Sequence, residues 1–285
     1  MQSLSRIALA ASLAVLSMAS QAADWSDTSI GYRYGSKFAE PFGASNIHKN
    51  IFDLNHVSGY AYGTNFFNVD LLMSDKNDPA APGSHNGAQE AYVVYRHTLD
   101  LSKVTGANLS YPGVVRNLGL TAGFDWNVKD DAGYNSKKRM LVAGPTVMFD
   151  VPGFLNVSLL QLWESNAPTN EFTGVATPRY SYDAHPMLTA AWAIPVPGGL
   201  PLSFEGFANF IAGKGKNEFG GSTAPETNID MQLMYDVGTL WNTPKKFKVG
   251  FEYQYWKNKF GNSYKGAAGD GAFAKTPMIR AEYHF

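Results

Sequence analysis

Hydrophobic and polar residues alternate one by one along most of this chain. In residues 246–256, aromatic or aliphatic side chains occupy every odd position from Phe247 to Tyr255. The positions between them, from Lys248 to Gln254, carry lysine, glycine, glutamate and glutamine. Successive side chains of a β-strand point to opposite faces. This stretch therefore predicts a strand with one apolar face and one polar, charged face.

About twelve segments of roughly ten residues repeat the pattern, which is the length of a tilted strand that crosses a bilayer. The one break falls in residues 100–111, where Asp100 or Ser102 is expected to cap a single helical turn that Gly106 ends. The predicted strands are residues 28–34, 49–58, 65–74, 89–99, 115–128, 138–149, 154–165, 179–194, 202–212, 228–237, 246–256 and 277–285.

The connections between these segments alternate in length. Those near residues 40, 80, 132, 170, 218 and 266 are long and polar, whereas those near 61, 106, 151, 198 and 241 are mostly short. Long loops on one rim and short turns on the other are typical of outer-membrane barrels.

The alternation alone also fits a soluble β-sandwich, whose apolar faces point inward. Aromatic residues near strand ends favour a membrane barrel instead, because they match the girdles found at both interfaces. Such a sheet must close, since an open edge in lipid leaves backbone groups without partners. We therefore predict an all-β protein, a closed antiparallel transmembrane β-barrel of about twelve strands in up-and-down meander order. The girdle candidates are Tyr34, Trp126, Trp163, Tyr180, Trp192, Trp241 and Phe285.

The first 22 residues differ from the rest of the chain. Arg6 precedes a short apolar run, and small residues follow up to Ala22, as in a secretory signal peptide cleaved after that residue. No later segment has the ~20 apolar residues of a transmembrane helix. We expect residues 1–22 to be a signal peptide, residues 23–285 to be one barrel domain, and the mature protein to reside in the bacterial outer membrane.

Composition excludes several other classes of function. Charged residues make up 16% of the chain, and the net charge of −1 argues against a nucleic-acid partner. The six histidines show no spacing typical of metal ligands. We therefore expect neither a metal nor another cofactor.

An apolar outer face leaves the polar face for the interior. A barrel of about twelve strands encloses a narrow pore or a filled one. Aromatic and ionisable side chains of that face are the candidates for binding a solute by stacking and hydrogen bonding. They are Arg33, Asp53, Asn55, Phe66, Asp70, Glu90, Tyr92, Arg96, Asp125, Glu205, Phe207, Glu252 and Trp256; the alternative is that the charges only pair with one another.

Two sets of segments resemble known membrane proteins. The C-terminal sequence RAEYHF, which ends at Phe285, resembles the last strand of bacterial outer-membrane proteins, and this implies recognition by the barrel-assembly machinery. The segments YGSKFAEP (34–41), NFFNVDLLMSD (65–75) and LDLSKVT (99–105) resemble the nucleoside-specific channel-forming (Tsx-type) outer-membrane family. That resemblance implies a twelve-stranded monomeric barrel with a slender pore for nucleosides, and no enzymatic activity.

Two other functions remain open. In one, the long loops serve as receptors for a phage or colicin on a barrel without specific transport. A barrel hydrolase is the third reading, because Ser181, Asp183 and His185 share one predicted strand face. Side chains two residues apart on a strand stand about 7 Å apart, however, which is too far for a nucleophile and its base. We therefore expect no catalytic residue.

Overall fold

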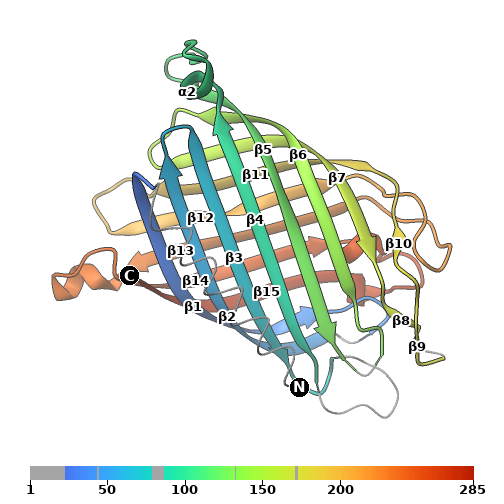
Figure 1. The fold of residues 1–285 in the computed structure, drawn as a ribbon. Helices are drawn as coiled ribbons and strands as arrows, with labels where there is room; N and C mark the ends of the chain where they lie inside the picture. Colours follow the sequence, from blue (N-terminus) through green and yellow to red (C-terminus); the bar gives the residue numbers. More distant parts are fainter. Residues whose placement is uncertain (1–22, 44, 79–86, 132, 171–172) are drawn as a thin grey trace.

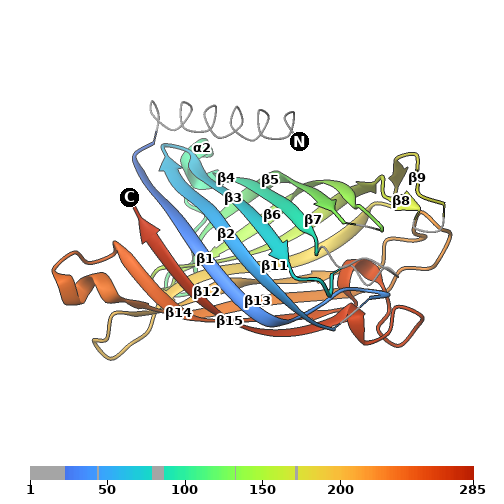
Figure 2. The same cartoon turned by 90° about the horizontal axis from the view of Figure 1, so that it is seen from below.

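The computed structural model describes residues 23–43, 45–78, 87–131, 133–170 and 173–285, and its strands form a tilted, closed barrel (Figures 1 and 2). The predicted signal peptide, residues 1–22, lies outside the described residues. Within the described part of the chain, no helix has the length and hydrophobicity that a membrane crossing requires.

Twelve antiparallel strands in meander order make up the barrel wall in the described residues, as the alternation predicted. The last strand pairs with the first, so the sheet has no open edge in this wall. The strands are β1 (Trp25–Ala39), β2 (Ser45–Tyr60), β3 (Gly63–Ser74), β4 (Gln89–Asp100), β5 (Val115–Asp130), β6 (Lys137–Phe149), β7 (Phe154–Asn166), β11 (His185–Pro195), β12 (Leu202–Ile211), β13 (Glu226–Asp236), β14 (Phe247–Lys257) and β15 (Phe273–His284).

The two ends of the barrel differ in their connections. One end, here called the turn end, carries the C-terminus, the helix α2 (Leu101–Thr105) and the 3-10 helix η1 (Val237–Trp241). The other, the loop end, carries the short strands β8 (Thr169–Asn170), β9 (Val175–Ala176) and β10 (Tyr180–Ser181), and the 3-10 helices η2 (Lys259–Gly261) and η3 (Asp270–Ala272). The predicted alternation in length holds only in part, because β1 and β2, at the loop end, are close in sequence (Ala39 to Ser45), whereas β4 and β5, at the turn end, are far apart (Asp100 to Val115).

The helical turn after β4 forms where the sequence predicted it. The Asp100 side chain accepts a hydrogen bond from the backbone N–H of Lys103 at 3.1 Å. Gly106 ends the helix in the left-handed conformation, with φ of 72°. A polar N-cap and a C-terminal glycine therefore define both ends of α2.

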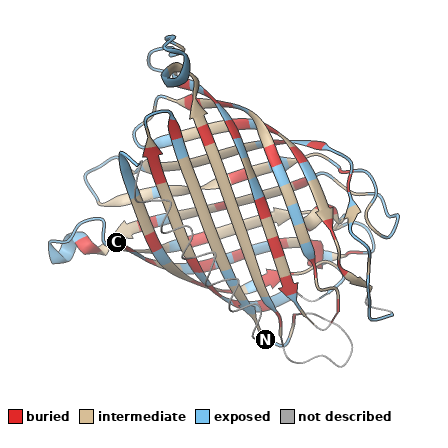
Figure 3. Ribbon diagram, in the orientation of Figure 1, coloured by how far each residue is buried: buried red, intermediate tan, exposed pale blue. Residues whose placement is uncertain are grey.

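The faces of the wall are oriented as predicted. Large apolar side chains point outward, and Phe251, at 74% exposure, is the most exposed example. Figure 3 shows buried residues interspersed with intermediate and exposed ones along the strands. Charged residues on the opposite face of the strands, such as Arg33 and Glu252, are buried. This is the reverse of a soluble protein, and it is the arrangement of a barrel in lipid.

The interior is not uniformly polar. Phe38, Ile47, Ile51 and Met278 form one buried apolar cluster inside the barrel near the loop end. A second cluster lies across the barrel, on β6, β7 and β11, and consists of Val142, Leu160, Leu162 and Met187. These side chains fill part of the interior and narrow it.

The predicted continuous strand 179–194 is wrong. Residues 182–184 separate β10 from β11 and lie opposite only Trp163 and Glu164 of β7. The extra residue shifts the parity, as a β-bulge does. Tyr182 therefore points inward and is buried, whereas Asp183, which was predicted on the same face as His185, is exposed.

Candidate functional site

The strand register places all thirteen predicted site residues on inward-facing positions of the barrel wall. They do not form one site. The structure gathers them into several groups at different distances along the barrel axis, and some of these groups also include residues that were not among the thirteen.

The largest group, here called the seam cluster, lies where the first and last strands meet. It consists of Arg33, Asp53, Asp70, Glu252, Arg280 and Glu282. Arg33 contacts Asp70 at 2.5 Å, Glu252 at 3.2 Å and Asp53 at 3.4 Å. Arg280 contacts Glu282 at 2.5 Å, Glu252 at 2.9 Å and Asp53 at 3.7 Å. Two guanidinium groups thus hold four carboxylates together across β14, β15, β1, β2 and β3.

A glycine makes room for this cluster. A side chain at Gly31 would place its Cβ 2.5 Å from both carboxylate oxygens of Asp53. The Asp53 side chain is fully buried, and neither of its oxygens has a hydrogen-bond partner among the described residues. Its charge is balanced only by the two arginines, so Gly31 and these arginines together position Asp53.

A second group lies on β4 and β5. Arg96 forms an ion pair with Asp125, and the hydroxyl of Tyr92 donates to the same carboxylate at 2.9 Å. Phe66 stands directly opposite Arg96 on the neighbouring strand β3. An aromatic ring and a guanidinium group therefore lie side by side on the inner wall.

A row of hydroxyl groups continues around the wall from there. Thr98 and Thr121 share a hydrogen bond at 2.8 Å, Thr121 and Thr146 at 2.6 Å, and Thr146 and Ser158 at 2.7 Å. The row crosses β4, β5, β6 and β7 and carries no charge. This part of the inner wall is thus neutral and polar, in contrast to the ionic seam cluster.

Glu40 organises a cluster of lysines at the loop end. Its carboxylate accepts hydrogen bonds from Lys49 at 2.7 Å and Lys259 at 2.9 Å. Lys129 lies 3.9 Å from it and donates to Asp78 at 2.7 Å. Burial raises the pKa of the Glu40 carboxyl, but the three lysines outweigh burial and hold that pKa well below its ordinary value. The cluster ties the loops after β1, β3 and β14 to the strands beneath them.

The loop between β12 and β13 folds back over the same opening. Lys214 donates to both carboxylate oxygens of Glu164 on β7, at 2.7 and 2.8 Å. Glu218 accepts hydrogen bonds from the hydroxyls of Tyr134 and Tyr182. Burial, and then the negative charge of Glu218, raise the pKa of both tyrosines, so they remain neutral donors. These contacts hold the loop between β12 and β13 against the loop end of the barrel.

The remaining predicted residues have local partners. Asn55 donates to Asn68 at 3.4 Å, and Asn127 donates to Glu90 at 2.5 Å. Lys248 donates to Glu205 at 3.0 Å. Phe207 stands opposite Asp230, and the indole N–H of Trp256 donates to Glu226 at 2.5 Å.

Sequence reasoning missed most of the loop-end residues. Five of them lie on inward-facing positions of their strands. Lys49, Lys138 and Glu164 fall within the predicted strands 49–58, 138–149 and 154–165, so the alternation alone identifies them, whereas Lys129 and Glu226 lie just beyond the predicted strand ends. Four others sit in connections, where no periodicity marks a direction: Glu40, Lys214, Glu218 and Lys259.

The predicted face shared by Ser181, Asp183 and His185 does not exist. Ser181 is exposed on β10, whereas His185 is 1% exposed at the start of β11. The Nδ1 atom of His185 lies 2.8 Å from the backbone oxygen of Asp183. Among the described residues, no three histidine or acidic side chains converge as metal ligands.

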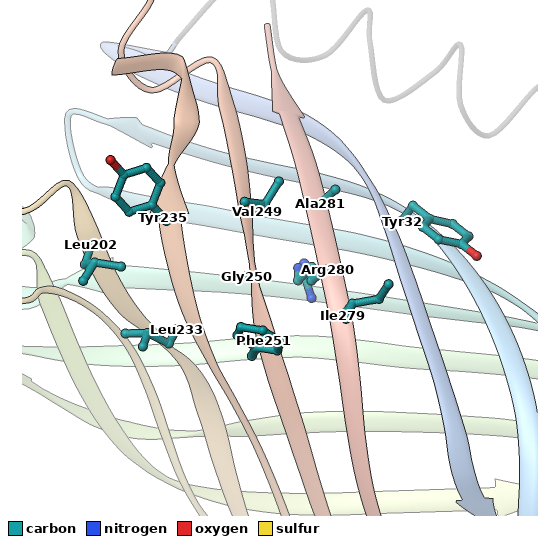
Figure 4. Close-up of a pocket in the computed structure, with 10 residues that line it drawn as sticks. All are labelled: Tyr32, Leu202, Leu233, Tyr235, Val249, Gly250, Phe251, Ile279, Arg280 and Ala281. Carbon is teal, nitrogen blue, oxygen red and sulfur yellow. The ribbon is translucent and has the colours of Figure 1, made fainter. Parts of the chain in front are cut away.

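Two shallow grooves lie on the outer face of the wall. The larger, of about 470 Å³, is bordered by outward side chains of β12 to β15 and β1, including Tyr32, Leu233, Phe251 and Ile279 (Figure 4). The second adjoins it over β12 to β15. Their apolar lining belongs to the surface that faces lipid, so neither groove is part of the interior site.

Comparison with known proteins supports the fold. A solved outer membrane channel from Pseudomonas putida F1 is similar, with a TM-score of 0.51 and 12% sequence identity over 93% of this chain and 96% of that one. The KdgM porin in complex with disordered oligogalacturonate matches at a TM-score of 0.40 and 12% identity, over 90% of this chain and 99% of that one. The translocator domain of the autotransporter NalP from Neisseria meningitidis matches at a TM-score of 0.45 and 10% sequence identity, over 95% of this chain and 92% of that one. No family model and no curated protein matches the sequence.

Proposed function

We propose that this protein is an outer-membrane channel through which small polar solutes, and nucleosides in particular, diffuse passively. The observation that carries the proposal is the direction in which the side chains of the barrel wall point. Apolar side chains such as Phe251 are exposed on the outside, while arginines, lysines and carboxylates line the inside. That arrangement suits a barrel in lipid with a polar path through it.

The chemistry of the inner wall favours an uncharged, flat and polar solute. Most interior charges are already paired, so a charged solute would have to break an ion pair to gain a partner. Aromatic side chains stand beside polar ones at three places, where Phe66 adjoins Arg96, Phe207 adjoins Asp230, and Trp256 adjoins Glu226. A nucleobase stacks on such rings while its ribose forms hydrogen bonds. The resemblance of residues 34–41, 65–75 and 99–105 to Tsx-type channels points to the same solutes.

The C-terminal strand supports assembly into the outer membrane. Tyr283 and Phe285 point outward at the turn end, and Phe285 is 66% exposed. We infer that the assembly machinery binds this strand end and that the folded barrel acts as a monomer.

Uptake into proteoliposomes tests the transport function. Vesicles with the purified protein should take up labelled uridine faster than protein-free vesicles, and unlabelled nucleosides should compete. In single-channel recordings, nucleosides should block the current reversibly, whereas sugars of similar size should not. Uptake equal to that of protein-free vesicles would refute the channel, and block by sugars and nucleosides alike would refute the nucleoside preference.

A further inference from the structure

Phe260, in the connection between β14 and β15, makes a contact that crosses the barrel mouth. Its ring centre lies 3.5 Å from the Nζ atom of Lys138, which belongs to β6. The ring also packs edge-on against Trp256 of β14, with centres 4.9 Å apart. Strands β7, β11, β12 and β13 separate β6 from β14 around the wall. Phe260 therefore joins side chains from two separated parts of the wall across the loop end.

The backbone of Phe260 is held in an unfavourable conformation. Its φ is 60°, in the left-handed region that residues with a bulky side chain rarely adopt. Strained residues of this kind persist only where their surroundings hold them, and they are common at switches and ligand sites. Around Phe260, the backbone N–H of Gly261 donates to the carbonyl oxygen of Asn258 at 2.8 Å and closes the turn, while the ring contacts Lys138 and Trp256.

Lys138 depends on this ring because its other partners are occupied. The nearest carboxylate, that of Glu164, lies 3.9 Å from its Nζ atom. Both oxygens of Glu164 already accept hydrogen bonds from Lys214. The face of the Phe260 ring is therefore the closest partner of the Lys138 ammonium group, through a cation–π contact.

We propose that Phe260 is a displaceable plug, and that its ring occupies the place that the planar ring of an entering solute takes. The solute ring would pack on Trp256 and under Lys138 after Phe260 has moved outward. The inference rests on the proposed channel function and names its entrance site, with a neutral nucleobase as the ligand class. The side-chain oxygen of Asn228, whose residue stands opposite Trp256, has no hydrogen-bond partner in the described residues and is ready to accept a base N–H.

Phe260→Gly tests the plug, because glycine adopts a φ of 60° without strain and removes only the ring. Phe42→Gly is the matched control. Phe42 also has a φ of 61° in a loop-end connection, but its side chain is 64% exposed. In planar bilayers, Phe260→Gly should raise the single-channel conductance about twofold or more, since the ring obstructs the mouth. Phe42→Gly should conduct like wild type; equal conductance of Phe260→Gly and wild type would overturn the plug.

Current block by uridine tests the ligand class. Uridine should block Phe260→Gly at about threefold lower concentration or less than wild type, because the site no longer has to be vacated first. Lys138→Met should weaken the block about fivefold through loss of the cation–π contact. Lys137→Met is the control, because Lys137 is the exposed neighbour on the other face of β6; this variant should leave the block by uridine unchanged. Ribose, which lacks a planar ring, should block none of them.

The outcomes separate this inference from the transport function. If uridine blocks wild type and Phe260→Gly at the same concentration, the plug is wrong while the nucleoside channel stands. If Phe260→Gly conducts more but no nucleoside blocks any variant, the nucleoside assignment is wrong for the site and for the channel. If Lys138→Met and Lys137→Met behave alike, Lys138 does not contact the solute.

Discussion

Arg33 and Arg280 stand directly opposite each other on β1 and β15, the pair of strands that closes the barrel. Like charges in opposite positions destabilise a strand pair. Here Glu252 of β14 contacts both guanidinium groups, at 3.2 Å to Arg33 and 2.9 Å to Arg280. Glu252 therefore bridges the two arginines at the closure of the barrel, together with Asp53, which lies 3.4 Å from Arg33 and 3.7 Å from Arg280.

Glu252→Gln should accordingly destabilise the barrel by about 3 kcal/mol, because it removes the nearer of the two carboxylates that these buried arginines share. Glu205→Gln is the matched control, since Glu205 pairs with Lys248 alone and is more exposed; its cost should be about 1 kcal/mol. Urea unfolding in lipid vesicles, followed by tryptophan fluorescence, measures both. Equal losses for the two variants would show that the seam cluster has no special role.

The loop-end cluster predicts a pH dependence. The folded-state pKa of Glu40 lies well below its ordinary value of 4.5, with its lysine partners outweighing burial. A depressed pKa contributes stability that is fully present above the unfolded value and is lost as the pH falls through the folded value. Glu40→Gln should therefore cost about 2 to 3 kcal/mol at neutral pH, and the cost should stay constant down to about pH 5.

Unfolding curves of wild type and Glu40→Gln, compared at several pH values, check this. The difference between them should begin to shrink as the pH falls below about 4.5, the ordinary pKa of this carboxyl group, and should disappear only well below that pH. A difference that disappears already between pH 7 and pH 5 would mean that the lysines do not hold Glu40 ionised.

The outer face predicts a depth-dependent cost of charge. Phe251 lies in the middle of β14 and is exposed on the outside. Phe251→Arg should destabilise the barrel in a bilayer by about 2 to 4 kcal/mol, as for other lipid-facing positions near the midplane. Leu240→Arg, in the 3-10 helix at the turn end, should cost much less, because Leu240 is equally exposed but lies beyond the strands. Equal costs in lipid vesicles would argue against a membrane-facing wall.

The alternation of residues was enough to predict the barrel because the constraint acts on every strand. Each strand must present one face to one environment along its whole length, so the pattern repeats and small errors at strand ends do not matter. The pattern failed at residues 182–184, where one additional residue reverses the parity. The position of such a bulge depends on contacts with other segments. Here the backbone N–H of Asp183 donates to the backbone carbonyl oxygen of Lys214, which belongs to a distant loop.

The candidate site was predictable only as a set of inward-facing residues. Parity correctly placed Arg33, Asp53, Asp70 and Glu252 inside, but it says nothing about which of them meet. Their contacts depend on register between strands as far apart in sequence as β1 and β14, where Arg33 meets Glu252. The plug residue Phe260 lies in a connection, and its position follows from Lys138 across the mouth, so no local pattern reveals it.

The central claim is that the two faces of the wall meet different environments, and neighbouring residues on β13 test it most directly. The chain has no cysteine, so Leu233→Cys and Gln232→Cys each give a single site for a nitroxide label. Leu233 points outward at 45% exposure, and Gln232 points inward, where it donates to Glu205 at 3.4 Å. In lipid vesicles, the label at position 233 should collide mainly with oxygen dissolved in the bilayer, and the label at 232 mainly with a water-soluble paramagnetic complex. Two labels with the same preference would contradict a barrel with a lipid-facing exterior and a polar, water-accessible interior.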